Sequence, residues 1–327
     1  MFTFAGKLHI NNFSCIMANV IKIKKGLDIN LKGKASDVLL NGGKSDSYAI
    51  VPDYYNGIVP KVVAKVGEKV KAGSVLMIDK NRPEIKFVSP VSGEVTAVNR
   101  GEKRKVLSVV VKPEAQIEYE DFGKKNVASL KREEVKEAIL HAGMWPFIKQ
   151  RPYDIVASPA DEPRDIFVSA FYSAPLAPNF DFVVKGQEVD FQTGLDALAK
   201  LTDGKVYVGI RKGSSVSVKG VETVEVEGPH PAANVGVQIN HIKPINKGEV
   251  VWTVNPADVI VIGRLFNKGI ADFSRLVVIT GSETTERGYV KAIAGCTIAS
   301  LVDGKIMRGN DDIRIISGNV LTGTKAE

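Results

Sequence analysis

The stretch from residue 57 to residue 95 constrains the fold most, because β-branched residues alternate there between closely spaced glycines and prolines. Two strands are predicted over residues 59–66 and 70–78, joined by a turn at Gly67. A third is predicted over residues 85–88 and runs into the turn residues Ser89-Pro90. Alternating β-branched residues bounded by Gly and Pro are typical of short strands with tight turns. The stretch therefore predicts a small β-structure rather than a helix.

The spacing inside this stretch resembles the flattened β-barrel of biotinyl and lipoyl domains. It reads V-G-E-x-V-x-x-G-x-x-L from Val66, followed by S-P-x-x-G-x-V from Ser89. Carrier domains of this kind present a modified lysine at a hairpin tip, but the tip here is Arg82-Pro83-Glu84. Lys80 and Lys86 stand about three residues from its centre, which changes their exposure and direction on a two-residue period. We therefore favour a structural barrel without biotin or lipoate, with a carrier as the alternative.

Length and composition fit a soluble protein of several domains. The chain has 327 residues, 44% hydrophobic and 25% charged, which suits about two or three domains. No apolar run approaches the roughly 20 residues that span a bilayer. Cys15 and Cys296 are the only cysteines and form no C-x-x-C pair, which argues against a disulfide framework, a zinc knuckle and a cysteine-ligated cluster. We expect a protein of the reducing cytoplasm, without a metal site.

Positive charge is concentrated in the N-terminal third. Residues 17–112 hold 18 Lys and Arg against 9 Asp and Glu, although the whole chain carries only +7. The densest cluster is Lys103-Arg104-Lys105. Since no nucleic-acid motif accompanies this charge, it favours docking on an anionic membrane surface or an acidic partner over binding of DNA or RNA. The alternative is a solvated lysine-rich face.

The N-terminal boundary follows from where the first strand pattern begins. Residues 1–16 lack the charged start and the apolar run of a secretory signal. The alternating pattern starts only after Met17. We expect residues 1–16 to be a dispensable extension, Met17 to be the natural start, and residues 17–125 to form the barrel region.

The middle of the chain alternates between helix and strand patterns. A first helix is expected between a cap at Ser129 and a stop at Gly143. The further expected elements are strands at residues 166–170, 206–210, 221–226 and 276–280 and helices at residues 187–201 and 257–268. Alternation of this kind favours helices covering a largely parallel sheet. We assign residues 126–274 to this α/β domain and residues 275–327, with short strands and Gly turns, to a small β-rich module.

Nucleotide and catalytic motifs are absent from the sequence. No two glycines stand two positions apart, so the dinucleotide fingerprint G-x-G-x-x-G does not occur. Gly43-Lys44-Ser45 imitates the end of a phosphate loop but reads as a turn. His230 lies between two prolines that would hold its ring in a set direction, and His241 follows 11 residues later. We consider His230 either a ligand-binding residue or a histidine satisfied by neighbouring backbone.

From Met17 to Gly323 the chain resembles the A subunit of the bacterial sodium-translocating NADH:quinone reductase. Besides the barrel motif, the segments that carry this resemblance are Ile23-Lys24-Lys25-Gly26-Leu27-Asp28, Arg151-Pro152-Tyr153, Pro163-Arg164-Asp165-Ile166-Phe167-Val168, Gly228-Pro229-His230-Pro231, Asp258-Val259-Ile260-x-Ile262-Gly263 and Ser317-Gly318-Asn319-Val320-Leu321-Thr322-Gly323. The resemblance implies an α/β multidomain fold. Its parts would be a biotinyl/lipoyl-like barrel (barrel-sandwich hybrid), a Rossmann-like α/β domain without the dinucleotide fingerprint, and a small soluble-ligand-binding β-grasp module, followed in the family by a helical region.

This family is akin to the C subunit of the Rnf complex and to the flavin subunit of respiratory complex I. Those relatives hold flavin with a Gly-rich loop after a helix equivalent to residues 133–142. Here the loop is Gly143-Met144-Trp145-Pro146-Phe147, in which Trp145 and Phe147 would fill the space that glycine leaves for phosphate. The resemblance thus implies a flavoprotein scaffold that has lost its flavin. The family pattern also has a pair of histidines near residues 238–240, and this sequence lacks that pair.

The expected function is that of a peripheral subunit on the cytoplasmic face of the bacterial inner membrane, assembled with the other subunits of the sodium pump. We expect no tightly bound NADH or flavin and no catalytic centre, and we expect any small-molecule site to be apolar. A quinone such as ubiquinone needs an apolar cleft with one or two polar groups. The candidates for such a site, or alternatively for filling the space of a lost flavin, are His141, Trp145, Phe147, Phe171, Tyr172 and His230.

Two other functions stay open at this point. One is a flavin- and NADH-binding electron-transport subunit of the Rnf type, which would make the pure protein yellow. The other is a stand-alone ligand-binding or carrier module, which would show added mass on Lys80 or Lys86.

Overall fold

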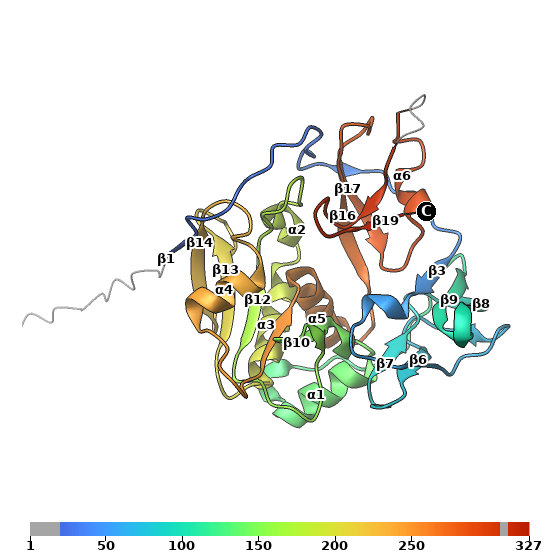
Figure 1. Ribbon diagram of the computed structural model, residues 1–327. Coiled ribbons are helices and arrows are strands. Elements are labelled where there is room, and N and C mark those ends of the chain that lie inside the picture. Colours follow the sequence, from blue (N-terminus) through green and yellow to red (C-terminus); the bar gives the residue numbers. More distant parts are fainter. Residues whose placement is uncertain (1–19, 308–312, 327) are drawn as a thin grey trace, which may run out of the picture.

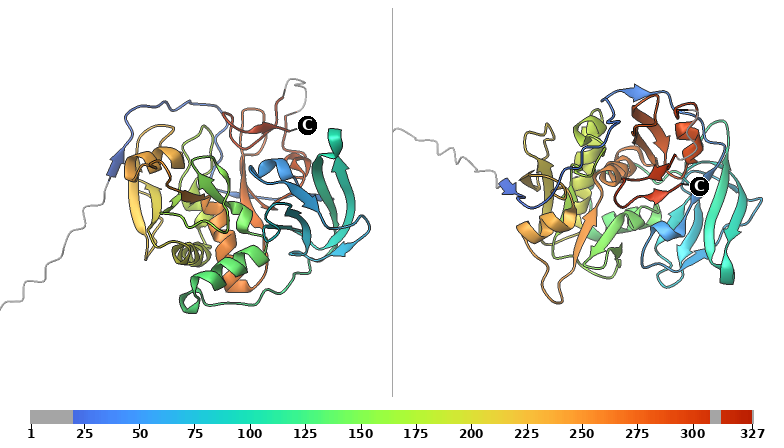
Figure 2. Two further views of the ribbon diagram at one scale, coloured as in Figure 1. Left: turned by 60° about the horizontal axis from the view of Figure 1, so that its bottom comes forward. Right: turned by 45° about the horizontal axis from the view of Figure 1, so that its top comes forward.

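The computed structural model describes residues 20–307 and 313–326. The α/β domain and the barrel lie on opposite sides of the molecule, and the C-terminal strands contact both (Figures 1 and 2). Tyr289 of these strands accepts a hydrogen bond from the backbone of Asn179, while Cys296 pairs with Tyr48 of the barrel. Within the described residues no helix is long and apolar enough to cross a membrane. The expectations for residues 1–16 and for Met17 fall outside the described part of the chain.

The barrel consists of two small antiparallel sheets with the strand orders β3-β9-β8-β5 and β4-β6-β7. Its elements are β3 (Tyr48–Ile50), β4 (Pro60–Val62), β5 (Lys69–Val70), β6 (Val75–Asp79), β7 (Lys86–Val88), β8 (Gly93–Arg100) and β9 (Val106–Pro113), with short 3-10 turns at Pro52–Tyr54 and Glu102–Arg104. Leu76, Val95 and Val109 are fully buried between the sheets. The prediction of short strands is confirmed, although 70–78 divides into two strands and β8 was not predicted.

The hairpin tip of the barrel is fastened to the rest of the molecule. Arg82 donates from Nε to Asp79 at 2.8 Å, from Nη2 to the carbonyl of Gly57 at 2.9 Å and from Nη1 to the carbonyl of Val156 at 3.2 Å. Asp79 itself is fully buried. Since Val156 belongs to the α/β domain, Arg82 pins the tip against a second domain. The position where a carrier would need a swinging arm is therefore an anchored contact.

The α/β domain is built on a seven-stranded sheet with the order β1-β14-β13-β12-β15-β10-β11. The strands are β1 (Val20–Lys22), β10 (Ile148–Arg151), β11 (Ile155–Val156), β12 (Ile166–Ser169), β13 (Val206–Arg211), β14 (Glu222–Glu227) and β15 (Val251–Val254). Strands β1, β14, β13, β12 and β15 run parallel, and β10 and β11 are antiparallel additions at one edge. The prediction of a largely parallel sheet is confirmed; β10, β11 and β15 were not predicted.

The helices of this domain are α1 (Arg132–His141), α2 (Phe180–Val184), α3 (Glu188–Lys200), α4 (Val235–Ile242) and α5 (Pro256–Lys268), with 3-10 turns at Val127–Ser129 and Trp145–Phe147. The predicted helices over residues 187–201 and 257–268 are confirmed as α3 and α5. Ser129 was a wrong choice of cap, because it lies in the preceding turn and donates to the carbonyl of Asn126. Helix α1 begins three residues later, where Glu134 accepts from the backbone N–H of Lys131 at 2.8 Å.

Helices α3 and α5 pack at very close range through two glycines. A Cβ atom added to Gly263 would lie 1.7 Å from the carbonyl oxygen of Asp190, and one added to Gly194 would lie 2.1 Å from that of Val259. No side chain fits at such distances, so glycine at both positions lets the helix backbones touch. Helical periodicity alone gives no sign of this contact.

The C-terminal strands form a three-stranded sheet and a two-stranded one. The first has the order β16-β17-β2, and the second joins β18 to β19. The elements are β2 (Leu39–Leu40), β16 (Ser274–Ile279), β17 (Gly288–Ile293), α6 (Ile298–Val302), β18 (Ile316–Ser317) and β19 (Thr324–Lys325). The predicted strand at residues 276–280 is confirmed as β16. Residues 20–40, assigned above to the barrel region, supply a strand to each of the other two domains: β1 pairs with β14 and β2 pairs with β17.

Candidate functional site

A pocket of about 590 Å³ lies at the carboxyl edge of the parallel sheet. Its floor and one wall come from the loop that leaves β12, residues 171–181, and from Arg211 at the end of β13. Its other wall is the segment between β1 and β2, residues 23–38, which we call the strap, and Tyr289 of β17 completes it. Ligands of open α/β sheets bind at this edge, where successive connections turn to opposite faces. The pocket is therefore the first candidate for a binding site.

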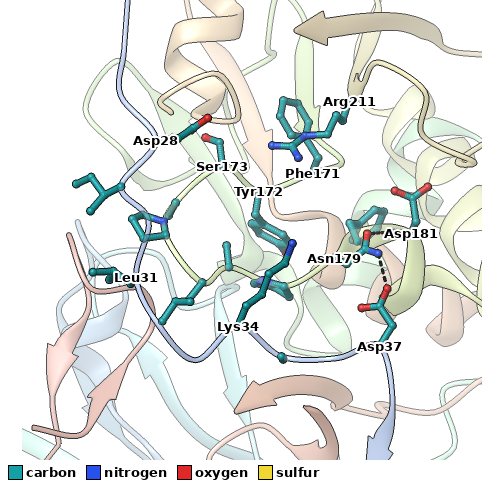
Figure 3. Close-up of a pocket in the computed structure, with 18 of the residues that line it drawn as sticks. Asp28, Leu31, Lys34, Asp37, Phe171, Tyr172, Ser173, Asn179, Asp181 and Arg211 are labelled. Carbon is teal, nitrogen blue, oxygen red and sulfur yellow. Dashed lines mark hydrogen bonds between the residues drawn. The ribbon is translucent and has the colours of Figure 1, made fainter. Parts of the chain in front are cut away.

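The upper end of the pocket in Figure 3 is organised by Ser173. Its hydroxyl accepts from the backbone N–H of Ala233 at 3.0 Å and lies 3.0 Å from Nδ1 of His230. The Ser173 hydroxyl therefore links the imidazole of His230 to the backbone of Ala233. The backbone of His230 also donates to Asp28 and accepts from Leu27 of the strap. His230 thus ties the strap to the loop of the pocket.

Two carboxylates that line the pocket are already hydrogen-bonded. Asp37 accepts from the side chain of Asn179 at 2.8 Å (Figure 3). Asp181 accepts from Ser214 and twice from Ser215 at 2.6 to 2.8 Å. Burial opposes ionisation of Asp181, but the hydrogen bonds from Ser215 and Ser214 outweigh it and lower the pKa of this carboxyl. Both carboxylates therefore already accept hydrogen bonds from the protein.

The two cations of the pocket are uncommitted. Among the residues that the structure describes, no hydrogen bond or ion pair engages the side chain of Lys34 or Arg211. Arg211 lies over the ring of Phe171, with its guanidinium carbon 5.7 Å from the centroid, a cation–π arrangement. Figure 3 shows Lys34 reaching from the strap toward Tyr172. Both groups are free to donate to a ligand.

The pocket combines apolar and charged groups. Its walls contain Ile29, Leu31 and the Ala- and Pro-rich loop of residues 174–178, but charged groups line it as well. The reason is the strap, which the sequence assigned to the barrel region and which brings Asp28, Lys34 and Asp37 to the α/β domain.

Of the six residues proposed to bind a quinone, three lie at the pocket and three do not. Phe171 and Tyr172 line the pocket, and His230 touches it through Ser173. Trp145 is fully buried in the core, donates to the carbonyl of Ala157 at 2.8 Å and meets Trp252 edge to face at a centroid distance of 5.4 Å. Trp145 is therefore a core residue outside the lining of the pocket.

His141 and Phe147 also lie away from the pocket. His141, at the end of α1, is exposed and packs edge-on against Phe122 at 5.3 Å. Phe147 packs against Phe273 at 6.0 Å and lies 5.9 Å from the guanidinium carbon of Arg275.

A polar junction missed from the sequence lies where the three domains meet. Asp258 on α5 pairs with Arg275 of β16 at 3.1 Å, and Lys149 of β10 lies 5.2 Å from the ring of Tyr55. Burial raises the pKa of Asp258, and Arg275 opposes the shift. Burial likewise lowers the pKa of Lys149 and raises that of Tyr55 to about 12. Tyr172 lines the pocket, and its hydroxyl donates to Asn255 at 3.2 Å. Because Asn255 directly precedes α5, which carries Asp258, this junction lies next to the pocket.

The basic cluster Lys103-Arg104-Lys105 forms the exposed turn between β8 and β9. Lys103 and Arg104 have positive φ angles of 52° and 60°, and Lys105 pairs with Asp53 at 2.6 Å. One of its three charges is thus already neutralised within the barrel.

Sequence reasoning found the aromatic side of the pocket and missed its polar side. Phe171 and Tyr172 were found because they follow a predicted strand. Arg211 has the same signal, since it directly follows the predicted strand at residues 206–210, but Lys34 and Asp37 reach the pocket only through the path of the strap.

Comparison with known proteins identifies all three parts of the chain. Family models match residues 21–114 as the NqrA N-terminal barrel-sandwich hybrid domain, residues 130–271 as the NqrA second alpha/beta domain and residues 276–327 as the NQRA C-terminal domain. Among solved structures, an NAD+-reducing NiFe-hydrogenase in the H2-reduced state matches 49% of this chain and 35% of its own at 14% identity and a TM-score of 0.37. No conclusion rests on that match.

Curated relatives match nearly the whole chain. The A subunit of the Na(+)-translocating NADH-quinone reductase of Vibrio atlanticus is 38% identical over 312 residues, which cover 94% of this chain and 69% of the relative. The corresponding protein of Hahella chejuensis is 36% identical over 313 residues, covering 94% of this chain and 70% of the relative. This chain therefore belongs to the NqrA family, the A subunits of the Na+-translocating NADH-quinone reductase.

Proposed function

We propose that this chain is a peripheral subunit on the cytoplasmic face of a sodium-pumping NADH:quinone oxidoreductase complex, with a role in assembly and in binding a quinone. In this proposal it holds neither flavin nor NADH tightly, and its partners are the other subunits of the complex. The α/β domain is a Rossmann-like scaffold without the fingerprint, and the sheet β16-β17-β2 serves as a β-grasp module.

One observation carries the quinone part of the proposal. The walls of the pocket combine the apolar Ile29, Leu31 and the loop of residues 174–178 with two cationic donors, Arg211 and Lys34, that have no protein partner in the described residues (Figure 3). A quinone is flat and neutral and carries two carbonyl oxygens on opposite sides of its ring. It can lie against the apolar walls and accept hydrogen bonds from these donors, which is the usual design of a small-molecule site.

The geometry also favours a quinone over the ligands of the flavin-bearing alternative. Flavin mononucleotide and NADH carry phosphates, which call for backbone N–H groups at a helix start or a Gly-rich loop. The loop at residues 143–147 is filled by Trp145, which is fully buried. The pocket already holds three carboxylates, Asp28, Asp37 and Asp181, which would repel a phosphate.

Titration of the purified chain with a water-soluble short-chain quinone, flavin mononucleotide and NADH tests the proposal. We expect quinone binding that weakens by roughly tenfold in Arg211→Gln, the loss expected for one hydrogen bond from a charged donor. Arg100→Gln, which removes an arginine from the exposed barrel strand β8, is the matched control and should change nothing. Micromolar affinity for flavin or NADH would overturn the proposal, as would quinone binding that ignores Arg211.

A further inference from the structure

The strap combines exposed apolar side chains with lysines that form no ion pair in the described residues. Four of the exposed large hydrophobic side chains lie in the strap, namely Leu27, Ile29, Leu31 and Val38, and two more flank it, Val20 in β1 and Leu39 in β2. Leu27 and Leu39 are 70% and 64% exposed. Lys24, Lys25 and Lys32 are also exposed, and within the described residues none of them forms an ion pair. Apolar groups exposed beside free cations make the strap a candidate interaction surface.

The strap is held in place at its ends and near its middle. Ile23 donates to Glu227, Leu27 donates to His230, Gly33 accepts from Gly281, and Val38 accepts from Tyr289, at 2.8 to 2.9 Å. It runs over the surface of the molecule from β1 to β2 (Figures 1 and 2). Neither strand nor helix forms between these two strands. The apolar side chains are thus presented at fixed points rather than on a free tail.

From these features we propose that the strap docks on an anionic lipid surface. Leucine and isoleucine side chains can enter the boundary between headgroups and acyl chains, and the flanking ammonium groups can pair with lipid phosphates. Each lysine near such a surface strengthens partitioning by about fivefold. An acidic protein would match the charges but would leave the exposed leucines without a reason, so the observations favour lipid over a soluble acidic partner.

Docking through the strap would also place the pocket at the membrane. Ile29 and Leu31 belong to the strap and line the pocket, so a docked strap brings its wall against the bilayer, from which a lipid-soluble quinone would arrive. This consequence rests on the proposed quinone role, but the docking itself does not. Titration in solution tests the pocket and vesicle binding tests the strap, so the two ideas can fail separately.

The barrel supplies a matched control surface. Val63 and Val66 are 42% and 61% exposed, and the neighbouring Lys61, Lys65 and Lys69 are exposed without ion pairs in the described chain. The same number of charges can therefore be removed from a surface of similar composition that belongs to a folded barrel rather than to the strap.

Flotation of the full chain with vesicles of phosphatidylcholine, with and without phosphatidylglycerol, tests the proposal. We expect binding only to the anionic vesicles, weakening with salt because exposed charges are screened beyond about 8 to 10 Å. The triple variant Lys24→Gln, Lys25→Gln, Lys32→Gln should lose on the order of 100-fold in partitioning. The pair Leu27→Ser, Leu39→Ser should lose about tenfold or more. The barrel triple Lys61→Gln, Lys65→Gln, Lys69→Gln should lose less than threefold.

A second readout locates the contact without relying on affinity. The emission of Leu27→Trp should shift to the blue on addition of anionic vesicles, while that of Tyr54→Trp, introduced at a barrel position that is 64% exposed, should not. The proposal is wrong if the chain ignores anionic vesicles, if both triple variants lose equally, or if the leucine pair has no effect. If the chain does not bind lipid but its strap captures membrane subunits, the strap docks on a protein partner instead.

Discussion

Two regions of the α/β domain differ in what fills them. In the core, Trp145 and Trp252 pack edge to face and are at most 1% exposed. At the carboxyl end of the sheet, Tyr172, Arg211 and the strap surround an open pocket. One domain thus has a dry core that contributes stability and a polar pocket whose groups are only partly engaged. We expect substitutions at the first to change folding and substitutions at the second to change binding.

The largest effect is expected in the core. Trp145→Ala removes a fully buried indole and its hydrogen bond to Ala157, and loss of a buried aromatic costs about 3 to 5 kcal/mol. Urea unfolding followed by far-UV circular dichroism should show this loss. Tyr153→Ala, which removes a side chain that is 78% exposed, is the control and should stay within about 0.5 kcal/mol. Equal stability of the two variants would contradict the comparison.

The polar junction beside the pocket should give the next largest effect. Arg275→Met leaves Asp258 without its partner at 3.1 Å. Loss of one member of a buried pair costs about 3 to 5 kcal/mol, and we expect about 2 to 3 kcal/mol here because the side chain of Arg275 is 27% exposed. Asp258→Asn in the Arg275→Met background should restore part of the lost stability.

This cost should depend on pH in a defined direction. Burial raises the pKa of Asp258 above its ordinary value, against the pull of Arg275, so the folded state binds the proton more tightly than the unfolded state. Such a group contributes stability below its unfolded pKa of about 3.9, and that contribution is lost as the pH rises. Removal of Arg275 raises the pKa further. The cost of Arg275→Met should therefore be larger at pH 7 than at pH 4, and a cost independent of pH would refute this assignment.

Local sequence patterns predicted where strands and helices form better than they predicted which strands pair in space. Strands β12, β13 and β14 and helices α3 and α5 were predicted because burial on one face or both imposes a period on the sequence. The pairing of strand β1 was not predicted, because its partner β14 lies about 200 residues away and pairing at such distance leaves no local pattern.

The site was predictable to the same extent. Phe171, Tyr172 and Arg211 follow predicted strands, so the carboxyl-edge rule finds them. Lys34 and Asp37 depend on the path of the strap, and the pair Asp258–Arg275 depends on how three domains meet. Trp145 was proposed as a ligand residue because it follows a helix at a position typical of a cofactor loop, whereas its burial is decided by the packing of Trp252 on another strand.

A smaller effect is expected from an acid that lines the pocket. Asp181→Asn weakens the hydrogen bonds with Ser214 and Ser215, which should cost about 1 to 2 kcal/mol at pH 7. The pKa of Asp181 is lowered in the folded state, so its contribution is present above the unfolded pKa of about 3.9 and is lost as the pH falls. The stabilities of the two proteins, measured by urea unfolding, should therefore begin to converge as the pH falls below about 4. A difference that stays constant well below that pH would show that the charge of Asp181 contributes nothing.

The smallest effect on stability, and the sharpest test of the comparison, is expected at Arg211. Its side chain is exposed and has no hydrogen bond or ion pair in the described residues, and its only contact of note is with the ring of Phe171. Arg211→Gln should therefore change the free energy of unfolding by no more than about 0.5 kcal/mol, measured by the same urea titration as Trp145→Ala. If quinone affinity falls while stability holds, the carboxyl end binds without supporting the fold. If Arg211→Gln unfolds the domain as Trp145→Ala does, the core and the pocket are both structural and the distinction between them is lost.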